Sequence, residues 1–281
     1  MSKILSPTQT YHILEELNHQ PNKKLGQNFL IDKNIVKKSL TLANVQPHDK
    51  VVEIGPGLGT LSSALLEANV LLYAVEKDST LADYLSNTIK PNFPNNFHLL
   101  TADALDFPIA TLPILYFDNF KIIANLPYAI ATPWLDLILS GPLPISMTLM
   151  LQKEAADRFC AKEGSKSFGA ISIFLSSAFK KSNEHKVSRH CFYPEPNVDS
   201  TLLHLEKLPN PFIFHPKTKE LIRFFFTQRR KQIGSLIKQL PPSDNLTSWL
   251  NFLSSKKFPT TTRPEDLPIH MWQQLDFHLS V

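Results

Sequence analysis

The residues of this chain best suited to chemistry form the tetrapeptide Asn125-Leu126-Pro127-Tyr128, which follows the apolar run 121–124. They place an amide, a rigid turn and an aromatic ring at the carboxyl end of an expected buried strand, where open α/β sheets bind their ligands. The Asn125 side-chain oxygen and the Leu126 backbone carbonyl can together accept both hydrogens of an exocyclic amine, while Tyr128 stacks on the ring that carries it. An amino-bearing base such as adenine or cytosine fits this arrangement. Taken alone, the tetrapeptide is also compatible with an ordinary Asn-x-Pro turn after a strand.

A second candidate site is the glycine-rich turn Gly55-Pro56-Gly57-Leu58-Gly59, which follows the apolar run 51–54. Glycines allow a backbone to approach a ligand closely, and the N–H groups that begin a helix favour anionic or polar groups. Glu76 lies seventeen residues beyond Gly59, at the end of the next expected strand. Its carboxylate is well placed to accept hydrogen bonds from ribose hydroxyls, as in a dinucleotide site.

The glycine spacing nevertheless argues against NAD. The dinucleotide fingerprint is G-x-G-x-x-G, whereas this turn reads G-x-G-x-G and has Thr60 at the third expected glycine. The carboxylate of Glu53 suits a ligand with an amino group and a cationic centre, and S-adenosylmethionine has both. Asp103, which follows a third expected strand, can accept a hydrogen bond from the adenine amine of that cofactor, or it can simply cap a helix. A plain strand–turn–helix unit with packing glycines is the remaining alternative.

These motifs lie on an alternating pattern of strands and helices. The expected strands are 51–54, 70–75, 98–101, 122–124 and 146–151, and the expected helices are 58–68, 79–89, 132–139 and 154–162. Such alternation predicts an α/β fold with a mostly parallel, doubly wound sheet. The apolar segments 171–179 and 201–205 are expected to complete the sheet at an edge. Beyond residue 208 prolines separate short helical pieces, the longest over 217–240, so a small helical domain is expected there.

Composition restricts the classes of protein that remain. The 281 residues, 43% of them hydrophobic, suit one large and one smaller domain. Cys160 and Cys191 supply neither a disulfide framework nor a metal-ligand cluster, so we predict a reducing compartment and no metal. The first 17 residues lack the apolar core of a signal peptide, and charge, glycine and proline interrupt the apolar stretch 134–151. We therefore expect a soluble, cytoplasmic protein without membrane contact.

Positive charge collects in the second half of the chain. Residues 206–281 hold 11 Lys and Arg against 6 Asp and Glu, and residues 153–190 hold 8 against 4. Residues 1–152 hold 10 against 13. This asymmetry predicts contact with a polyanion, although charged helix faces that only contact water would give the same count.

At this point the chain resembles the ribosomal RNA adenine N6,N6-dimethyltransferase family, from about residue 23 to the C-terminal end. The motifs that carry the resemblance are Lys24-Leu25-Gly26-Gln27-Asn28-Phe29-Leu30, Glu53-Ile54-Gly55-Pro56-Gly57-Leu58-Gly59, Asn125-Leu126-Pro127-Tyr128, Gln152-Lys153-Glu154, Phe192-Tyr193-Pro194-Glu195-Pro196-Asn197-Val198-Asp199-Ser200 and Gln228-Arg229-Arg230-Lys231. The resemblance implies a Rossmann-like, S-adenosylmethionine-dependent methyltransferase domain over 23–207. An N-terminal extension over 1–22 and a helical domain over 208–281 that contacts RNA or the ribosome would flank it.

The resemblance also implies roles for individual residues. The cofactor would be held by a set drawn from both motifs at the sheet edge and from the N-terminal segment: Asn28, Leu30, Gly55, Glu76, Asp103 and Asn125. The catalytic set would be Asn125, Leu126, Pro127 and Tyr128, with Phe192 as the wall of the base slot opposite Tyr128. The family usually has Gly before the motif aspartate, whereas this chain has Ala102, whose methyl group would crowd the cofactor adenine.

The implied substrate is a pair of adjacent adenosines near the 3′ end of small-subunit ribosomal RNA, met by a monomer within an immature particle. RNA contact is predicted for basic residues of two clusters: Arg223, Arg229, Arg230 and Lys231, expected in one helical stretch, and Lys153 and Arg158. A resistance methyltransferase of large-subunit RNA is the closest alternative, but it typically has Ile where this chain has Leu126. An assembly factor that needs no catalysis is the alternative from another class.

Overall fold

The computed structural model describes residues 5–22 and 25–280, and they divide into two compact units. Unit 1 comprises Met1–Ala156 and Lys181–Lys207, and unit 2 comprises Asp157–Lys180 and Leu208–Val281. Unit 2 therefore contains a segment that lies before the expected domain boundary at residue 207. Each unit has buried hydrophobic residues of its own.

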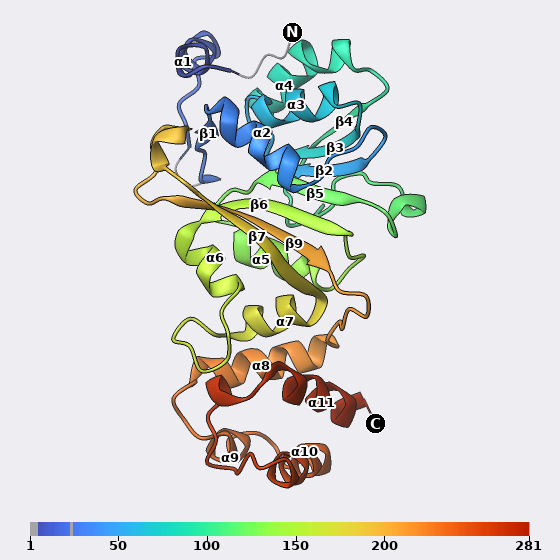
Figure 1. Ribbon diagram of the computed structural model, residues 1–281, viewed down its shortest axis with the longest axis vertical. Helices are drawn as coiled ribbons and strands as arrows, with labels where there is room; N and C mark the ends of the chain where they lie inside the picture. The colour runs from blue at the N-terminus through green and yellow to red at the C-terminus, as the bar shows by residue number, and fades with distance from the viewer. Residues whose placement is uncertain (1–4, 23–24, 281) are drawn as a thin grey trace. The chain divides into compact units, whose positions relative to one another are not determined.

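A seven-stranded sheet with the order β4-β3-β2-β5-β6-β9-β7 forms the centre of unit 1 (Figure 1). Its strands are β2 (Lys50–Ile54), β3 (Leu71–Glu76), β4 (Phe97–Thr101), β5 (Lys121–Asn125), β6 (Ser146–Gln152), β7 (Phe179–Val187) and β9 (Ser200–Lys207). The first five strands pair in parallel, and β9 pairs antiparallel with β6. The predicted mostly parallel sheet is confirmed.

Helices α1 (Pro7–Glu16) and α2 (Lys33–Leu42) precede the parallel strands. The connections between those strands contain α3 (Thr60–Glu67), α4 (Ser79–Thr88) and α5 (Ala131–Ile138), and α6 (Lys153–Phe159) follows β6. The strand order reverses between β2 and β5, and parallel crossovers are right-handed. Consequently α3 and α4 cover one face of the sheet and α5 the other (Figure 1).

Buried aliphatic strand residues hold the layers together. Val51, Leu72 and Ile123 are at most 1% exposed and share one core with the buried faces of α2 and α3. A smaller cluster joins Leu14 of α1 to Leu58 and Leu81, beside the glycine-rich turn and α4. The first 22 residues thus contribute a helix that packs behind the turn.

Unit 2 is helical and is built around aromatic side chains. Its helices are α7 (Ala170–Ala178), α8 (Pro216–Thr227), α9 (Ile233–Ile237), α10 (Asp244–Ser255) and α11 (Ile269–Ser280). The rings of Phe225, Trp249 and Trp272 lie 5.7–6.0 Å apart, centre to centre. Among the described residues, no helix combines the length and the apolar character that crossing a bilayer demands.

Two expectations for the elements are wrong. The pattern of residues 171–179 predicts an edge strand, but they form α7, and the edge strand is β7, which begins at Phe179. Most residues of α7 are buried, so the run is apolar on almost every side and its periodicity cannot separate helix from strand. The expected helical stretch 217–240 is interrupted after Thr227, and Arg229, Arg230 and Lys231 lie outside α8.

Candidate active site

One pocket of unit 1 opens at the carboxyl ends of β2, β3 and β5, at the point where the strand order reverses. This is where doubly wound sheets bind ligands. The residues that line it are 25–30, 53–58, 60–61, 75–77, 81, 103–104 and 125–130. All six residues predicted to hold the cofactor lie on its wall: Asn28, Leu30, Gly55, Glu76, Asp103 and Asn125.

The glycine-rich turn leaves no space for larger side chains. Gly55 and Gly57 have φ angles of 65° and 61°, in the left-handed region that side chains disfavour. A Cβ on Gly55 would lie 3.0 Å from Pro127 Cγ, and one on Gly57 would lie 3.1 Å from the ring of Phe29. The two glycines therefore allow the tetrapeptide and the N-terminal segment to close on the turn from both sides.

Two carboxyl groups lie behind the turn in a desolvated environment. Glu53 is 1% exposed and accepts a hydrogen bond from Ser62 Oγ at 2.6 Å. Burial raises the pKa of Glu53 to about 8, and the nearby Glu76 adds to the effect. The enclosed site thus stabilises the neutral acid.

Glu76 is fixed by the backbone around it. Its Oε2 accepts from the Gly57 N–H at 3.0 Å and its Oε1 from the Asp78 N–H at 2.9 Å. Burial still raises the pKa of Glu76 above its usual value, because desolvation outweighs these bonds. The bonds hold the carboxylate in one orientation at the pocket wall, as a ribose-binding group requires.

Asp103 has a cationic neighbour that the motifs did not indicate. Lys77 Nζ lies 2.6 Å from Asp103 Oδ2, and both residues line the pocket. The Lys77 hydrogen bond is the main cause that lowers the pKa of Asp103, and the Leu105 N–H helps. Ala102, in place of the family's usual glycine, is not among the described residues that line the pocket.

The tetrapeptide begins at Asn125, the last residue of β5, and its side chains are anchored. Asn125 Nδ2 donates to the Asn28 carbonyl at 2.9 Å, so this bond orients the Asn125 amide group. The Tyr128 hydroxyl is 2.7 Å from Ser200 Oγ on β9, and burial raises the pKa of Tyr128. Leu126 is 1% exposed and secures the turn in the core.

Phe192 is not among the described residues that line the pocket. Phe192 belongs to β8 (Phe192–Tyr193), which pairs antiparallel with β1 (Phe29–Leu30), opposite Leu30. Its side chain is 3% exposed and packs in the main core. It supports the strand that carries Leu30, and its stacking on a base stays a prediction.

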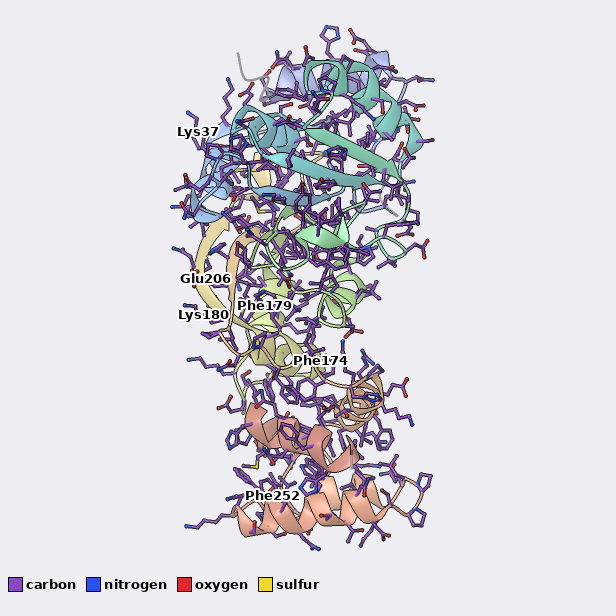
Figure 2. All side chains as sticks on the ribbon, turned by 90° about the vertical axis from the view of Figure 1, so that its right-hand side faces the viewer. Lys37, Phe174, Phe179, Lys180, Glu206 and Phe252 are labelled. Carbon is purple, nitrogen blue, oxygen red and sulfur yellow. The ribbon has the colours of Figure 1, made fainter. Side chains whose placement is uncertain are left out.

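The residues predicted to contact RNA differ in their surroundings. Lys153, Arg158, Arg223, Arg230 and Lys231 are exposed. Arg223 lies over the ring of Phe174, 5.5 Å from its centre. Phe174, which is labelled in Figure 2, is itself 3% exposed. Arg229 is engaged within unit 2, where its guanidinium pairs with Glu265 and donates to the carbonyls of Ser165 and Lys166.

Fold and pocket together define a class of protein. The structure is similar to that of a dimethyladenosine transferase from Plasmodium falciparum, with a TM-score of 0.73 and 22% identity over 90% of this chain and 97% of the other. It is also similar to the 23S rRNA methyltransferase ErmE, with a TM-score of 0.62 and 23% identity over 90% of this chain and all of the other. The fold is therefore that of the α/β methyltransferases.

Sequence similarity identifies the family within that class. Residues 18–263 match the family described as "Ribosomal RNA adenine dimethylase". Over 96% of its length the chain is 56% identical to "Ribosomal RNA small subunit methyltransferase A" of Opitutus terrae, covering 98% of that protein. A protein of the same name from Chlamydia abortus is 36% identical, with 98% of each chain covered. The chain belongs to the ribosomal RNA adenine dimethylase family, and it is an rRNA adenine dimethyltransferase.

Proposed function

We propose that this enzyme uses S-adenosylmethionine to dimethylate N6 of two adjacent adenosines near the 3′ end of small-subunit ribosomal RNA. It would act in the cytoplasm, as a monomer, during small-subunit biogenesis. The observation that carries the proposal is the shared pocket, in which Asn125 of the tetrapeptide lies on the same wall as Gly55, Glu76 and Asp103. The relatives named for the small subunit support the choice of RNA.

The residues of the pocket fit the proposed cofactor. Glu76 would accept hydrogen bonds from the ribose hydroxyls, and Asp103 would accept one from the adenine amine. Gly55 would allow close approach of the methionine part, and Glu53, a buried carboxyl group that also lines the pocket, would attract a cationic ligand. When bound, the cofactor supplies an electrophilic methyl group on a sulfonium.

Asn125 and Leu126 would prepare the target amine. The amine of adenine is a weak nucleophile because its lone pair is delocalised into the ring. Asn125 Nδ2 donates a hydrogen bond to the Asn28 carbonyl. The other polar atom of the amide, Oδ1, can therefore accept an amine hydrogen. With the Leu126 carbonyl accepting the other hydrogen, the nitrogen would become more tetrahedral and its lone pair would be available to attack an electrophilic methyl group. Orientation of this kind contributes roughly 7–11 kcal/mol in favourable cases.

Tyr128 would hold the base after it leaves its stack. Extrusion of a base is less costly from a loop than from a duplex. Stacking on an aromatic ring contributes about 1–3 kcal/mol per base and offsets part of that cost. Each transfer would form a nitrogen–methyl bond as the sulfur–methyl bond breaks, and the nitrogen would then release one proton to water. One amine hydrogen would remain after the first transfer for Asn125 or Leu126 to hold, so the same site could act twice.

The decisive experiment measures methyl transfer from labelled S-adenosylmethionine to unmodified small subunits and, separately, to large-subunit RNA. Dimethyladenosine confined to the small subunit would support the proposal, and labelling of large-subunit RNA alone would assign the enzyme to the resistance class. Asn125→Ala should abolish transfer even at saturating S-adenosylmethionine. Normal turnover in this variant would contradict the role of Asn125, and particle binding without any labelling would favour the assembly-factor alternative.

A further inference from the structure

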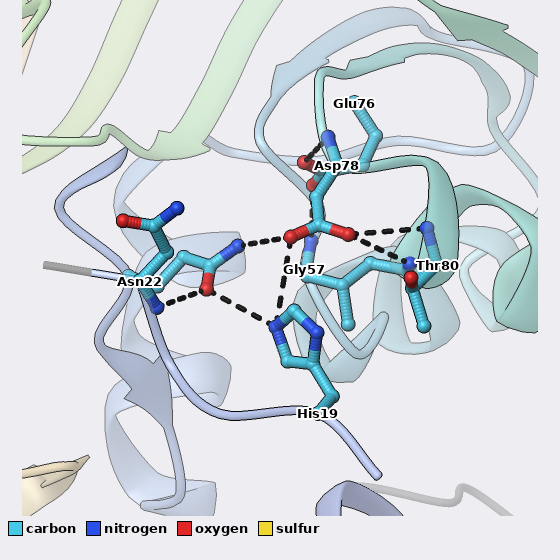
Figure 3. A network of polar contacts seen from close by, with 8 residues as sticks. His19, Asn22, Gly57, Glu76, Asp78 and Thr80 are labelled. Atoms are coloured by element: carbon cyan, nitrogen blue, oxygen red, sulfur yellow. Dashed lines mark hydrogen bonds and ion pairs between the residues drawn. The ribbon is translucent and has the colours of Figure 1, made fainter. Parts of the chain in front are cut away.

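The segment before the first strand is tied to α4 by a network of polar side chains (Figure 3). Gln27 is at its centre. Its Nε2 donates to Asp78 Oδ2 at 2.9 Å, while its Oε1 accepts from the Asn22 N–H at 2.7 Å and from His19 Nε2 at 3.2 Å. His19 Nε2 also lies 3.6 Å from Asp78 Oδ2. One amide thus joins two points of the N-terminal segment to a carboxylate 51 residues away.

Asp78 links this network to the pocket. Its Oδ1 accepts from the N–H groups of Thr80 and Leu81 and caps α4. Its own N–H donates to Glu76 Oε1, whose partner oxygen accepts from the Gly57 N–H (Figure 3). Glu76, whose carboxylate is proposed to bind ribose, is therefore oriented by the backbone of Asp78, and the Asp78 side chain accepts from Gln27.

The other side of the same segment contacts the tetrapeptide. A Cβ on Gly26 would lie 3.2 Å from the Tyr128 backbone nitrogen, and the Asn28 carbonyl accepts from Asn125 Nδ2. Phe29 lies against Gly57. Residues 26–30 thus form one wall of the pocket, and that wall is fastened to Asn125 on one side and to Asp78 on the other.

We propose that Gln27 is a positioning residue, which with His19 and Asp78 forms a latch that seats residues 26–30 on the cofactor pocket and orients Glu76. The proposal rests on the proposed use of S-adenosylmethionine. Gln27 acts through Asn28, Leu30 and Glu76 rather than by reaction chemistry. Its amide is required because the site demands a donor toward Asp78 and an acceptor toward Asn22 and His19 on the same group.

A reciprocal exchange of amide and carboxylate tests the latch. Gln27→Glu removes the donor and places two carboxylates together, and Asp78→Asn places two NH₂ groups together. In the double variant the new amide at position 78 donates to the new carboxylate at position 27, whose other oxygen still accepts from Asn22 and His19. The amide oxygen at position 78 still caps α4.

We expect each single variant to weaken S-adenosylmethionine binding about tenfold or more and the double variant to return to within about threefold of wild type. Gln20→Glu, on the exposed Gln20 of the same segment, is the charge-matched control.

Calorimetry gives the cofactor affinity, and hydrogen exchange of amides 26–30 in the free protein gives a readout that needs no cofactor. Both single variants should accelerate this exchange, and the double variant should slow it again. The latch is overturned if Gln27→Glu binds cofactor like Gln20→Glu, or if the double variant is no better than either single variant. If wild type binds no S-adenosylmethionine, the proposed function fails, and the exchange data still decide on the latch.

Discussion

Glu53 shows what an enclosed carboxyl group does to stability. Its usual pKa is 4.5 and burial raises it to about 8 in the folded protein. Between these pH values the folded protein keeps a proton that the unfolded chain has released, so folding is disfavoured as the pH rises. One group of this kind lowers the free energy of unfolding by about 1.4 kcal/mol per pH unit in that window.

Glu53→Gln should remove this pH dependence. The free energy of unfolding of the variant minus that of wild type is expected to increase from pH 5 to pH 8, as measured by denaturant titration at each pH. Ser62→Ala should raise the pKa of Glu53 further, because Ser62 donates the hydrogen bond that lowers this pKa. A difference between Glu53→Gln and wild type that stays constant across these pH values would show that Glu53 is already ionised.

Tyr128 separates the contribution of a ring from that of a hydroxyl. Tyr128→Phe loses the contact with Ser200 but keeps the aromatic face, and we expect less than about a fivefold fall in kcat/KM for methyl transfer. Tyr128→Ala should lose about tenfold to a hundredfold, since stacking contributes about 1–3 kcal/mol per base. Equal losses in both variants would assign the role of Tyr128 to its hydroxyl.

At the scale of elements, the end of α8 depends on Arg229. Its guanidinium binds Glu265 and two carbonyls of the loop before α7, in the region where the expected helix 217–240 is interrupted. Arg229→Ala should reduce the free energy of unfolding of unit 2 by about 2–3 kcal/mol, because charged hydrogen-bond partners are left unsatisfied. The measurement is denaturant unfolding followed by Trp249 and Trp272 fluorescence.

The neighbouring Arg230 is the matched control, because it is exposed and carries the same charge. Arg230→Ala should change stability by less than about 0.5 kcal/mol and weaken RNA binding. If Arg230→Ala destabilises unit 2 as much as Arg229→Ala does, the stabilising role assigned to the Arg229 guanidinium is wrong.

Sequence patterns predicted the elements of unit 1 well because its strands and helices alternate and differ in period. They failed at α7, where burial on almost every side removes the period, and at the end of α8, where a side chain fixes a loop. The sequence indicated pocket residues where a motif lies at the end of a strand, as at Glu76 and Asn125. The latch was not found, since hydrogen bonds between His19, Gln27 and Asp78 leave no periodic signal in the sequence.

At the scale of the whole molecule, charge is distributed unevenly between the units. Unit 2 contains 14 Lys and Arg and 7 Asp and Glu, whereas unit 1 contains 15 and 18. Because unit 2 has a net charge of +7 and unit 1 a net charge of −3, we expect unit 2 to provide most of the electrostatic attraction for RNA. Affinity for small-subunit RNA should therefore fall about a hundredfold between about 50 and 200 mM salt, which corresponds to about four phosphate contacts. Filter binding across a salt series measures the slope, and a flat response would exclude this surface as the main RNA contact.

The pairing of β1 with β8 also has a consequence for the time at which the enzyme becomes competent. Two-residue strands at Phe29–Leu30 and Phe192–Tyr193 meet across more than 160 residues of intervening chain. Closing so large a loop for so few hydrogen bonds costs entropy that only the finished core offsets. During synthesis, Leu30 has no strand partner until residue 192 has left the ribosomal tunnel. We therefore expect a nascent chain to contain every residue proposed to hold the cofactor before β1 is paired, and the wall of the pocket that β1 carries to be among the last parts of unit 1 to form.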